Sequence, residues 1–208
     1  IYDCVLAFSE GRALVKTAGK WGFIDLNGNL VIPCIYDYVY GFSGGRARVK
    51  KADKWGFIDV NGNTVIPFIY DDAWSFSEGR AQVKMNGKWG FIDVKGNLVI
   101  PCIYDDARRF SEGRAWVKKT GIWGYKANKC GFIDVNGKFV IPRIYDDAYS
   151  FSEGRAGVKK AGKWGFIDVK GNLVIPCIYD YVSNFLGGRT MVNKGGKQFY
   201  IDKNGNRI

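Results

Sequence analysis

Apolar and polar residues alternate in short runs that are separated by glycine-containing turns. In the stretch 69–102, this pattern predicts four strands, over residues 73–76, 80–84, 88–93 and 98–100, the last of which we expect to stop at Pro101. Short alternating runs bounded by Gly, Asn, Asp and Ser are typical of strands joined by tight turns. The pattern shows no helical apolar period of useful length, so the sequence predicts an all-β protein.

The same pattern returns six times. The tripeptide Ile-Tyr-Asp marks the start of each copy and begins at Ile1, Ile35, Ile69, Ile103, Ile144 and Ile178. We therefore expect one repeat domain over residues 1–208, built from six tandem four-stranded meanders with units 1–34, 35–68, 69–102, 103–143, 144–177 and 178–208.

Six such units favour a six-bladed β-propeller, because radial repetition leaves only short sheet edges. An open β-solenoid or superhelix is the alternative. Each unit is shorter than a typical propeller blade of about 40 residues. One position of the second strand is also chemically mixed, which we interpret as a water-facing column of a one-sided sheet. Its residues are Leu14, Arg48, Gln82, Trp116, Gly157 and Met191.

Tryptophan opens the third strand in five copies, and a second aromatic residue follows two positions later on the same strand face. The tryptophans are Trp21, Trp55, Trp89, Trp123 and Trp164. We interpret them as a core stripe between neighbouring copies, with the adjacent glycine allowing close backbone approach. A row of exposed platforms that stack sugars or bases is the alternative.

The motif GKWGFID, followed by a turn and VIP, recurs over residues 20–33, 54–67, 88–101 and 163–176. On this motif the chain resembles the WG-repeat (KWG) family, and the resemblance covers nearly the whole sequence. Members of that family are largely bacterial repeat proteins thought to mediate interactions. The resemblance therefore implies an interaction role and carries over no catalytic residue.

Two recurrent charged residues invite structural interpretations. The Asp that ends the third strand should accept backbone N–H bonds within its own Asp-x-x-Gly turn. The Arg that follows the first glycine turn, such as Arg80, should pair with the Asp of Ile-Tyr-Asp in a ladder between copies. Neither pattern supplies the clustered oxygen ligands that a calcium site needs, so we expect no metal ion.

Catalysis has little chemical support in this sequence. The chain contains no histidine, the commonest general base. Its carboxylates and cysteines are spread by the repeat, whereas an active site needs one asymmetric cluster. We expect a protein that is not an enzyme, uses no cofactor and has no small-molecule substrate.

Five cysteines are an odd number, and Cys34, Cys102 and Cys177 follow the same Val-Ile-Pro motif in different copies. We interpret the cysteines as buried free thiols, which mildly favours a reducing compartment such as the cytoplasm. No signal peptide or apolar run long enough for a membrane span is recognisable. Because the chain opens inside the repeat pattern and without Met, flanking targeting segments are compatible with the sequence and its compartment is unknown.

The net charge is +11, and lysines concentrate around the turn between the second and third strands. This arrangement predicts a basic rim that attracts polyanions such as nucleic acid or an anionic membrane surface, unless the lysines act only as solvated charges. Representative rim residues are Lys51, Lys54, Lys84, Lys88, Lys119, Lys160 and Lys163.

The fourth copy breaks the symmetry, because seven additional residues lengthen its hairpin. A unique loop on a repeat scaffold often carries specificity, although a tolerated insertion is the alternative. The candidate partner-binding residues are Trp123, Tyr125, Lys126, Lys129, Trp116, Arg108 and Arg109.

From the sequence we predict a non-catalytic repeat scaffold that binds another protein. Binding of an anionic polymer or an anionic membrane surface is the first alternative, and lectin-like glycan binding is the second. The sequence does not indicate an oligomeric state.

Overall fold

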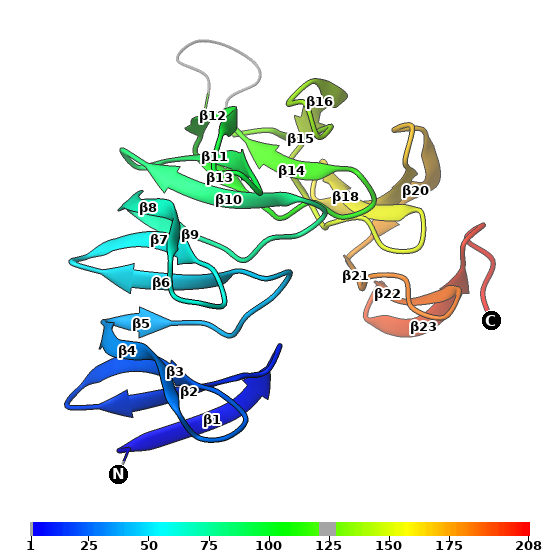
Figure 1. Ribbon diagram of the computed structural model, residues 1–208. Helices are drawn as coiled ribbons and strands as arrows, with labels where there is room; N and C mark the ends of the chain where they lie inside the picture. The colour runs from blue at the N-terminus through cyan, green and yellow to red at the C-terminus, as the bar shows by residue number, and fades with distance from the viewer. Residues whose placement is uncertain (1, 121–127) are drawn as a thin grey trace. The chain divides into compact units, whose positions relative to one another are not determined.

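The computed structural model describes residues 2–120 and 128–208, and its regular elements are all β-strands (Figure 1). The chain divides into two compact units, Ile1–Cys102 and Ile103–Ile208, each of which holds three of the sequence copies. The described residues contain no helix that is long and apolar enough to cross a membrane. The all-β class and the six tandem meanders are therefore confirmed.

The first unit contains three antiparallel sheets of four strands, in which strands that follow one another along the chain are paired. The strands of its first sheet are β1 (Cys4–Ser9), β2 (Arg12–Thr17), β3 (Lys20–Ile24) and β4 (Leu30–Tyr36). The second sheet has β5 (Tyr38–Val39), β6 (Ala47–Lys51), β7 (Lys54–Ile58) and β8 (Thr64–Tyr70). The third has β9 (Asp72–Ala73), β10 (Arg80–Met85), β11 (Lys88–Asp93) and β12 (Leu98–Tyr104).

The second unit contains two sheets of four strands and a last sheet of three. Its first sheet has β13 (Asp106–Ala107), β14 (Ala115–Lys118), β15 (Cys130–Ile133) and β16 (Phe139–Tyr145). The next has β17 (Asp147–Ala148), β18 (Arg155–Lys160), β19 (Lys163–Asp168) and β20 (Leu173–Tyr179). The last has β21 (Tyr181–Val182), β22 (Arg189–Lys194) and β23 (Lys197–Asp202).

The first and fourth strands differ from the sequence prediction. In the third copy the first strand is only Asp72–Ala73, because the chain leaves the ladder after Ala73. The fourth strand does not stop at Pro101 but runs over Leu98–Tyr104. The equivalent pair β19 and β20 shows a register shift between Trp164 and Phe166. Proline is accommodated in such a strand because it lies at the edge of the sheet, where a bulge relieves the need for its N–H.

The glycine of the Trp-Gly motif explains why the fourth strand can bend over the sheet. A Cβ atom at Gly90 would lie 2.5 Å from the carbonyl oxygen of Ile100 and 2.8 Å from the backbone of Pro101. Only glycine leaves room for this backbone contact. The fourth strand therefore covers the face of the sheet on which Gly90 and its cross-strand partner Val83 lie.

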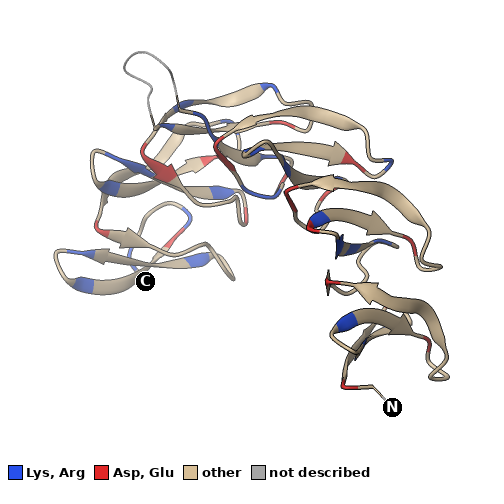
Figure 2. Ribbon diagram, turned by 90° about the vertical axis from the view of Figure 1, so that its left-hand side faces the viewer, with Lys and Arg blue, Asp and Glu red and all other residues tan. Residues whose placement is uncertain are grey.

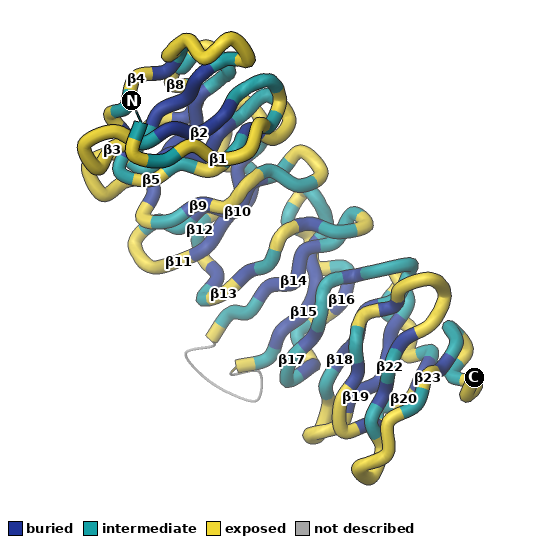
Figure 3. Tube along the Cα trace, turned by 90° about the horizontal axis from the view of Figure 1, so that it is seen from below, coloured by how far each residue is buried: buried dark blue, intermediate teal, exposed yellow. Residues whose placement is uncertain are grey.

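The chemically mixed column of the second strand is buried in the first five copies and half-buried at Met191, which corrects our interpretation of it as water-facing. In β10, Ala81, Gln82 and Val83 are all at most 5% exposed. Successive strand residues point to opposite faces, so both faces of the sheet are covered. In β2 and β18 the buried positions lie in the middle of the strand and exposed positions lie toward the turns, whereas the middle of β1 is exposed (Figure 3).

The core lies between neighbouring copies, as predicted. The ring centroids of Phe57 and Phe76, from consecutive copies, are 5.1 Å apart, and those of Phe166 and Phe185 are 4.9 Å apart. Trp89 and Trp164 are buried, whereas Trp21 and Trp55 are half-buried. Burial confirms the core interpretation for Trp89 and Trp164, Trp21 and Trp55 pack against core clusters while staying partly exposed, and Trp123 lies outside the described residues.

All five cysteines are free thiols, but only Cys130 is fully buried and the other four are half-buried. Burial raises the pKa of Cys102 and Cys177, and it raises the pKa of Cys130 to about 11. The thiols that follow Val-Ile-Pro also approach the backbone, since the Sγ of Cys102 is 3.7 Å from the carbonyl oxygen of Val83.

Candidate interaction surface

Arg12 and Arg155 contact backbone carbonyls rather than the Asp of Ile-Tyr-Asp, so the predicted arginine ladder is wrong at these positions. Arg12 donates through Nε to the carbonyl oxygen of Val60 at 3.2 Å, in the turn of the following copy. Arg155 makes the same contact with the carbonyl oxygen of Lys203 at 3.4 Å. At these two junctions the register between copies places the guanidinium against a backbone carbonyl, whereas the buried Nε atoms of Arg46 and Arg114 have no hydrogen-bond partner among the described residues.

Lysine, rather than the arginine that we predicted, pairs with the Asp of Ile-Tyr-Asp. Lys54, at the start of the third strand, lies 2.6 Å from the carboxylate of Asp71 in the next copy. This contact is the largest cause of a lowered pKa for Asp71. The equivalent ion pairs are Lys20–Asp37, Lys129–Asp146 and Lys163–Asp180.

The Asp that ends the third strand holds its own turn, as predicted. The Oδ1 atom of Asp59 accepts N–H bonds from Asn61 and Asn63, both at 2.9 Å. The amide side chain of Asn63 donates to Oδ2, and this bond is the largest cause of the lowered pKa of Asp59. The same backbone pattern is found at Asp25, Asp93, Asp134, Asp168 and Asp202.

Part of the predicted basic rim is neutralised within the protein. Lys54 and Lys163 form the ion pairs described above, and Lys88 also has an interaction partner. Lys84 lies 5.5 Å from the ring centre of Trp89. Basic and acidic segments are interspersed within each unit (Figure 2). The rim lysines Lys51 and Lys160 are exposed and Lys119 is half-buried.

The structure brings together two of the seven residues predicted around the insertion. The guanidinium carbon of Arg108 lies 4.6 Å from the ring centre of Trp116, which is only 3% exposed. Arg108 also donates to the carbonyl oxygen of Ala148 at 2.6 Å. The other described members are separate: Lys129 pairs with Asp146, and Arg109 is exposed. Trp123, Tyr125 and Lys126 lie outside the described residues.

Two positions of the repeat change from copy to copy and lie opposite each other on neighbouring strands. We call them the variable columns. The outer column is Leu6, Tyr40, Trp74, Arg108, Tyr149 and Ser183, and the inner column is the mixed column defined above. The backbone N–H of Tyr40 donates to the carbonyl of Arg48 at 2.9 Å, and that of Trp74 donates to the carbonyl of Gln82 at 2.9 Å.

In the first unit the variable columns form a cluster of aromatic rings around one arginine. The guanidinium carbon of Arg48 lies 3.7 Å from the ring centre of Tyr40, 4.6 Å from that of Trp55 and 5.4 Å from that of Trp74. Contacts of this length are attractive cation–π interactions. Arg48 also donates to the carbonyl oxygen of Ala73. We call Tyr40, Arg48, Trp55 and Trp74 the arginine cluster.

The arginine cluster is rigid inside and exposed outside. Arg48 is 5% exposed, whereas Tyr40 and Trp74 are 49% and 53% exposed. Burial is the largest influence on Arg48 and lowers its pKa, while Tyr40 and Asp72 act in the opposite direction. The cluster thus presents two large rings to solvent on a support that cannot rearrange freely.

In the second unit the same columns have different contents. The rings of Tyr149 and Trp164 stack with centroids 4.6 Å apart and planes at 17°. Gly157 lies beneath them, and a Cβ atom there would be 3.1 Å from the Tyr149 ring. Tyr149 also lines a shallow hollow of about 290 Å³ together with Tyr181, Ser183 and Asn184.

Sequence reasoning missed most of this surface. We noticed the inner column but assigned it to solvent, and we did not single out Tyr40, Trp74 or Tyr149. The signal that finds them is variation at fixed repeat positions, since two positions that vary together and lie opposite each other form one surface.

Comparisons with known proteins agree with this architecture. The family model "WG containing repeat" matches residues 1–21, 21–55, 55–89, 89–123, 131–164 and 164–197. No curated protein matches the chain.

Solved structures show the fold alone, because sequence identities are low. A eukaryotic initiation factor shares 13% identity over 96% of this chain and 62% of its own, with a TM-score of 0.58. The Kluyveromyces lactis protein Hsv2p shares 8% identity over 96% of this chain and 75% of its own, with a TM-score of 0.51. The chain thus spans less than two thirds of the initiation-factor chain.

Proposed function

The chain belongs to the WG-containing repeat family, and we propose that it is a non-catalytic scaffold that binds another protein through the arginine cluster. One observation carries this proposal. The positions shared by all copies are used in turns, ion pairs and core contacts, whereas the positions that vary present exposed Tyr and Trp rings around a buried Arg.

The residue types of the arginine cluster support a protein partner. Trp, Tyr and Arg are the residues most enriched among those that dominate binding energy at protein interfaces. Tyr40 and Trp74 offer large contact areas and lose little conformational freedom on binding, because Arg48 already fixes one side of each ring.

The carboxylates support a non-catalytic role, because their lowered pKa values have structural causes. The pKa of Asp71 is lowered by Lys54, and that of Asp59 by its own turn. Catalytic carboxylates usually owe their perturbation to a cleft and to a partner that serves the reaction. In the part of the chain that the structure describes, no group of three or more His, Cys, Asp or Glu side chains is placed to hold a metal ion.

The two alternatives have weaker support. An anionic polymer or membrane surface would need free lysines, but Lys54 and Lys163 are already paired. A glycan could stack on Tyr40 and Trp74, yet the cation inside the arginine cluster is more typical of a protein contact. A glycan array and a salt titration separate these alternatives from the proposal.

The test is affinity capture with the variant Tyr40→Ser/Trp74→Ser, followed by a binding measurement with the captured protein. We expect the double substitution to raise the dissociation constant at least about tenfold, since residues of this kind contribute 1 kcal/mol or more each. Leu98→Ser is the matched control, because Leu98 is 48% exposed in the same unit but lies outside the variable columns.

Unchanged capture by the double variant would contradict the proposal. Capture that disappears with added salt for both the double variant and the control would instead support the anionic alternative, because electrostatic binding to polyanions weakens steeply with salt.

A further inference from the structure

A glutamate in the first glycine turn contacts the equivalent turn of the following copy. Glu10, directly after β1, accepts the backbone N–H groups of Gly44 and Gly45 at 2.7 Å and 2.9 Å. In the second unit, Glu112 accepts the N–H of Gly154 at 2.9 Å. Successive N–H groups in a tight turn form a concave site that attracts a negatively charged oxygen.

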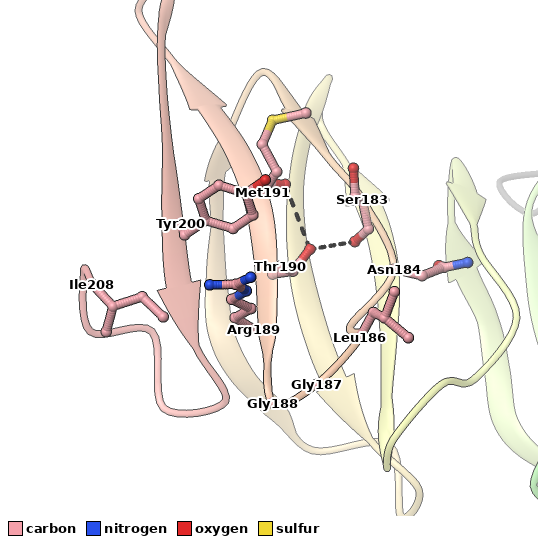
Figure 4. Close-up of a pocket in the computed structure, with 10 residues that line it drawn as sticks. All are labelled: Ser183, Asn184, Leu186, Gly187, Gly188, Arg189, Thr190, Met191, Tyr200 and Ile208. Carbon is pink, nitrogen blue, oxygen red and sulfur yellow. Dashed lines mark hydrogen bonds between the residues drawn. The ribbon is translucent and has the colours of Figure 1, made fainter.

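The fifth copy makes this contact with both oxygens of its carboxylate. Glu153 accepts the N–H of Gly187 at 2.6 Å and that of Gly188 at 2.9 Å. Figure 4 shows the receiving turn, in which these two glycines connect Leu186 to Arg189. The bond from Gly188 is the largest cause of the lowered pKa of Glu153. The turn therefore favours the ionised form of the carboxylate that it binds.

The glutamate adopts a backbone angle that is unfavourable for it. Its φ is 49° at Glu10 and 53° at Glu153, in the left-handed region that residues other than glycine rarely adopt. Such strain persists only where the surrounding structure compensates for it. The bonds between the carboxylate and the next turn supply this compensation.

The second copy lacks this glutamate. Gly44 stands at its position with a φ of 61°, so no glutamate from this position reaches the turn at residues 77–79 of the third copy. Among the described residues, none accepts the N–H of Gly79 in that turn. A Cβ atom at Gly44 or at Gly79 would meet no atom of a non-adjacent residue within 4 Å. The space that a glutamate side chain would enter is therefore open.

Two other donors close to Gly44 in the sequence also lack partners that their equivalents have. Ser152 donates to a carbonyl oxygen of the next copy at 2.8 Å, but the hydroxyl of its equivalent, Ser43, has no partner among the described residues. The buried Nε atom of Arg46 is likewise without a partner in the described part of the chain, and its Nη1 atom donates to the carbonyl oxygen of Gly45 at 3.2 Å. The residues that flank Gly44 thus supply unused hydrogen-bond donors and a positive charge.

We propose that the junction of the second and third copies binds a carboxylate group of a partner polypeptide in place of the missing glutamate. The N–H of Gly79 would donate to this group as the N–H of Gly154 donates to Glu112. Ser43 would supply a second donor and Arg46 the favourable charge, because hydrogen bonds to an ionised acceptor are the stronger ones. The site shares no residue with the arginine cluster, so it does not rest on the proposed function.

Acetate is the simplest probe of this site. The unmodified 208-residue chain would be titrated with sodium acetate at constant ionic strength and followed by amide proton–nitrogen NMR spectra. We expect the amide resonance of Gly79 to shift and to reach saturation. The dissociation constant should be about 1 mM or higher, since only about two or three exposed hydrogen bonds hold the ion.

Gly44→Glu should abolish this shift, because it fills the site with an internal carboxylate at a φ that Glu10 already adopts. Asn86→Glu is the matched control. It adds the same charge at a φ of 50°, but in the turn between β10 and β11. This control should bind acetate like the unmodified chain.

Glu10→Gly tests the same chemistry at another junction and does not depend on the folding of Gly44→Glu. It removes the internal carboxylate from the N–H groups of Gly44 and Gly45. Acetate should then shift the amide resonances of these two glycines, which should not respond in the unmodified chain.

Three short peptides identify the source of the carboxylate. Acetyl-Ala-Glu-Ala-amide carries only a side-chain carboxylate, acetyl-Ala-Ala-Ala carries only a C-terminal one, and acetyl-Ala-Ala-Ala-amide carries neither. At least one of the first two should shift the Gly79 resonance, and the tighter of them indicates whether the site prefers an acidic side chain or a chain end. The third should cause no shift.

Four results would overturn the proposal. They are no saturable shift at Gly79 with acetate, the same shift in Gly44→Glu, a loss of the shift in Asn86→Glu, and an equal response to the peptide that lacks a carboxylate. None of these substitutions changes the arginine cluster, so a negative result here leaves the proposed protein partner of that cluster to its own test.

Discussion

The fourth and fifth copies fill the same space in different ways. In the fourth, the indole of Trp116 belongs to β14 and a small residue, Cys130, occupies the usual tryptophan position in β15. In the fifth, Gly157 stands in β18 and the indole of Trp164 in β19. All four residues are buried.

This difference shows that these two copies fill a similar volume with different residues. One indole is buried in each of these two copies, but its strand of origin changes, and the outer column changes with it. Arg108 lies over Trp116, whereas Tyr149 stacks on Trp164. A conserved backbone can therefore present a cation in one copy and a phenol in the next.

The largest effect should come from the glycine that both copies share. A Cβ atom at Gly131 would lie 2.5 Å from the carbonyl oxygen of Ile141, a backbone atom that cannot move aside. We expect Gly131→Ala to cost about 3 kcal/mol or more in the free energy of unfolding, measured by urea denaturation.

Gly157→Ala is the matched control for this glycine. A Cβ atom at Gly157 would meet side-chain atoms of Tyr149 and Val182 at 3.1 Å and 3.2 Å. We expect it to cost about 1 kcal/mol, in the lower range for overpacking. Equal costs for the two substitutions would show that the fixed and the variable glycine are equivalent.

Giving the fifth copy the residue sizes of the fourth should show that positions 157 and 164 are energetically coupled. Trp164→Cys alone should cost about 3 kcal/mol through an unfilled cavity, and Gly157→Trp alone about 2 kcal/mol through overpacking. The double variant imitates the fourth copy, so its cost should fall below the sum of the two by about 1 kcal/mol or more. Additive costs in a double-mutant cycle would contradict the volume argument.

Alkaline pH should distinguish the copy that carries Cys130. Burial raises the pKa of this thiol from 9.0 to about 11. The unfolded chain loses the proton first, so stability is fully present below about pH 9 and falls by about 2–3 kcal/mol as the pH rises to about 11. In urea denaturation, the free energy of unfolding of Cys130→Ala should fall less over this pH range than that of the unmodified chain. Identical pH profiles for the two proteins would refute the assignment of this decrease to Cys130.

Acidic pH should have the smallest effect on the free energy of unfolding, and it should weaken the lysine–aspartate ion pair of both copies alike. Lys129 lowers the pKa of Asp146, and Lys163 lowers that of Asp180. Because both pKa values lie below the ordinary 3.8, their stabilisation is present above that pH and is lost as the pH falls below it.

Asp180→Asn should reduce the loss of stability on acidification and should change stability near neutrality only slightly, since exposed ion pairs contribute little. The measurement is the urea midpoint between about pH 6 and about pH 2. A steeper acid profile in the variant would contradict the sign of this effect.

The sequence was sufficient for features that depend on local chemistry. The copy boundaries, most strands and the turn held by residues such as Asp59 follow from spacing and from the bonds that Asp makes to nearby backbone N–H groups. The core role of Trp89 and Trp164 follows from their periodic placement beside glycine.

Features that depend on the register between copies could not be predicted in this way. Spacing alone does not show whether Arg12 or Lys20 reaches Asp37, because both recur with the same period. The structure assigns the ion pair to Lys20. The inner column was misjudged for a related reason: Gln82 and Arg48 are polar, yet stacking buries them among their neighbours.

Proline in the last strand of a sheet also limits incorrect pairing between similar strands during folding. Pro67 lies in β8 and Pro176 in β20, each the last strand of its sheet and thus an open edge. An edge strand without one of its N–H donors is a poor template for a foreign strand. These prolines should therefore discourage strand exchange and aggregation in a chain whose segments are nearly interchangeable.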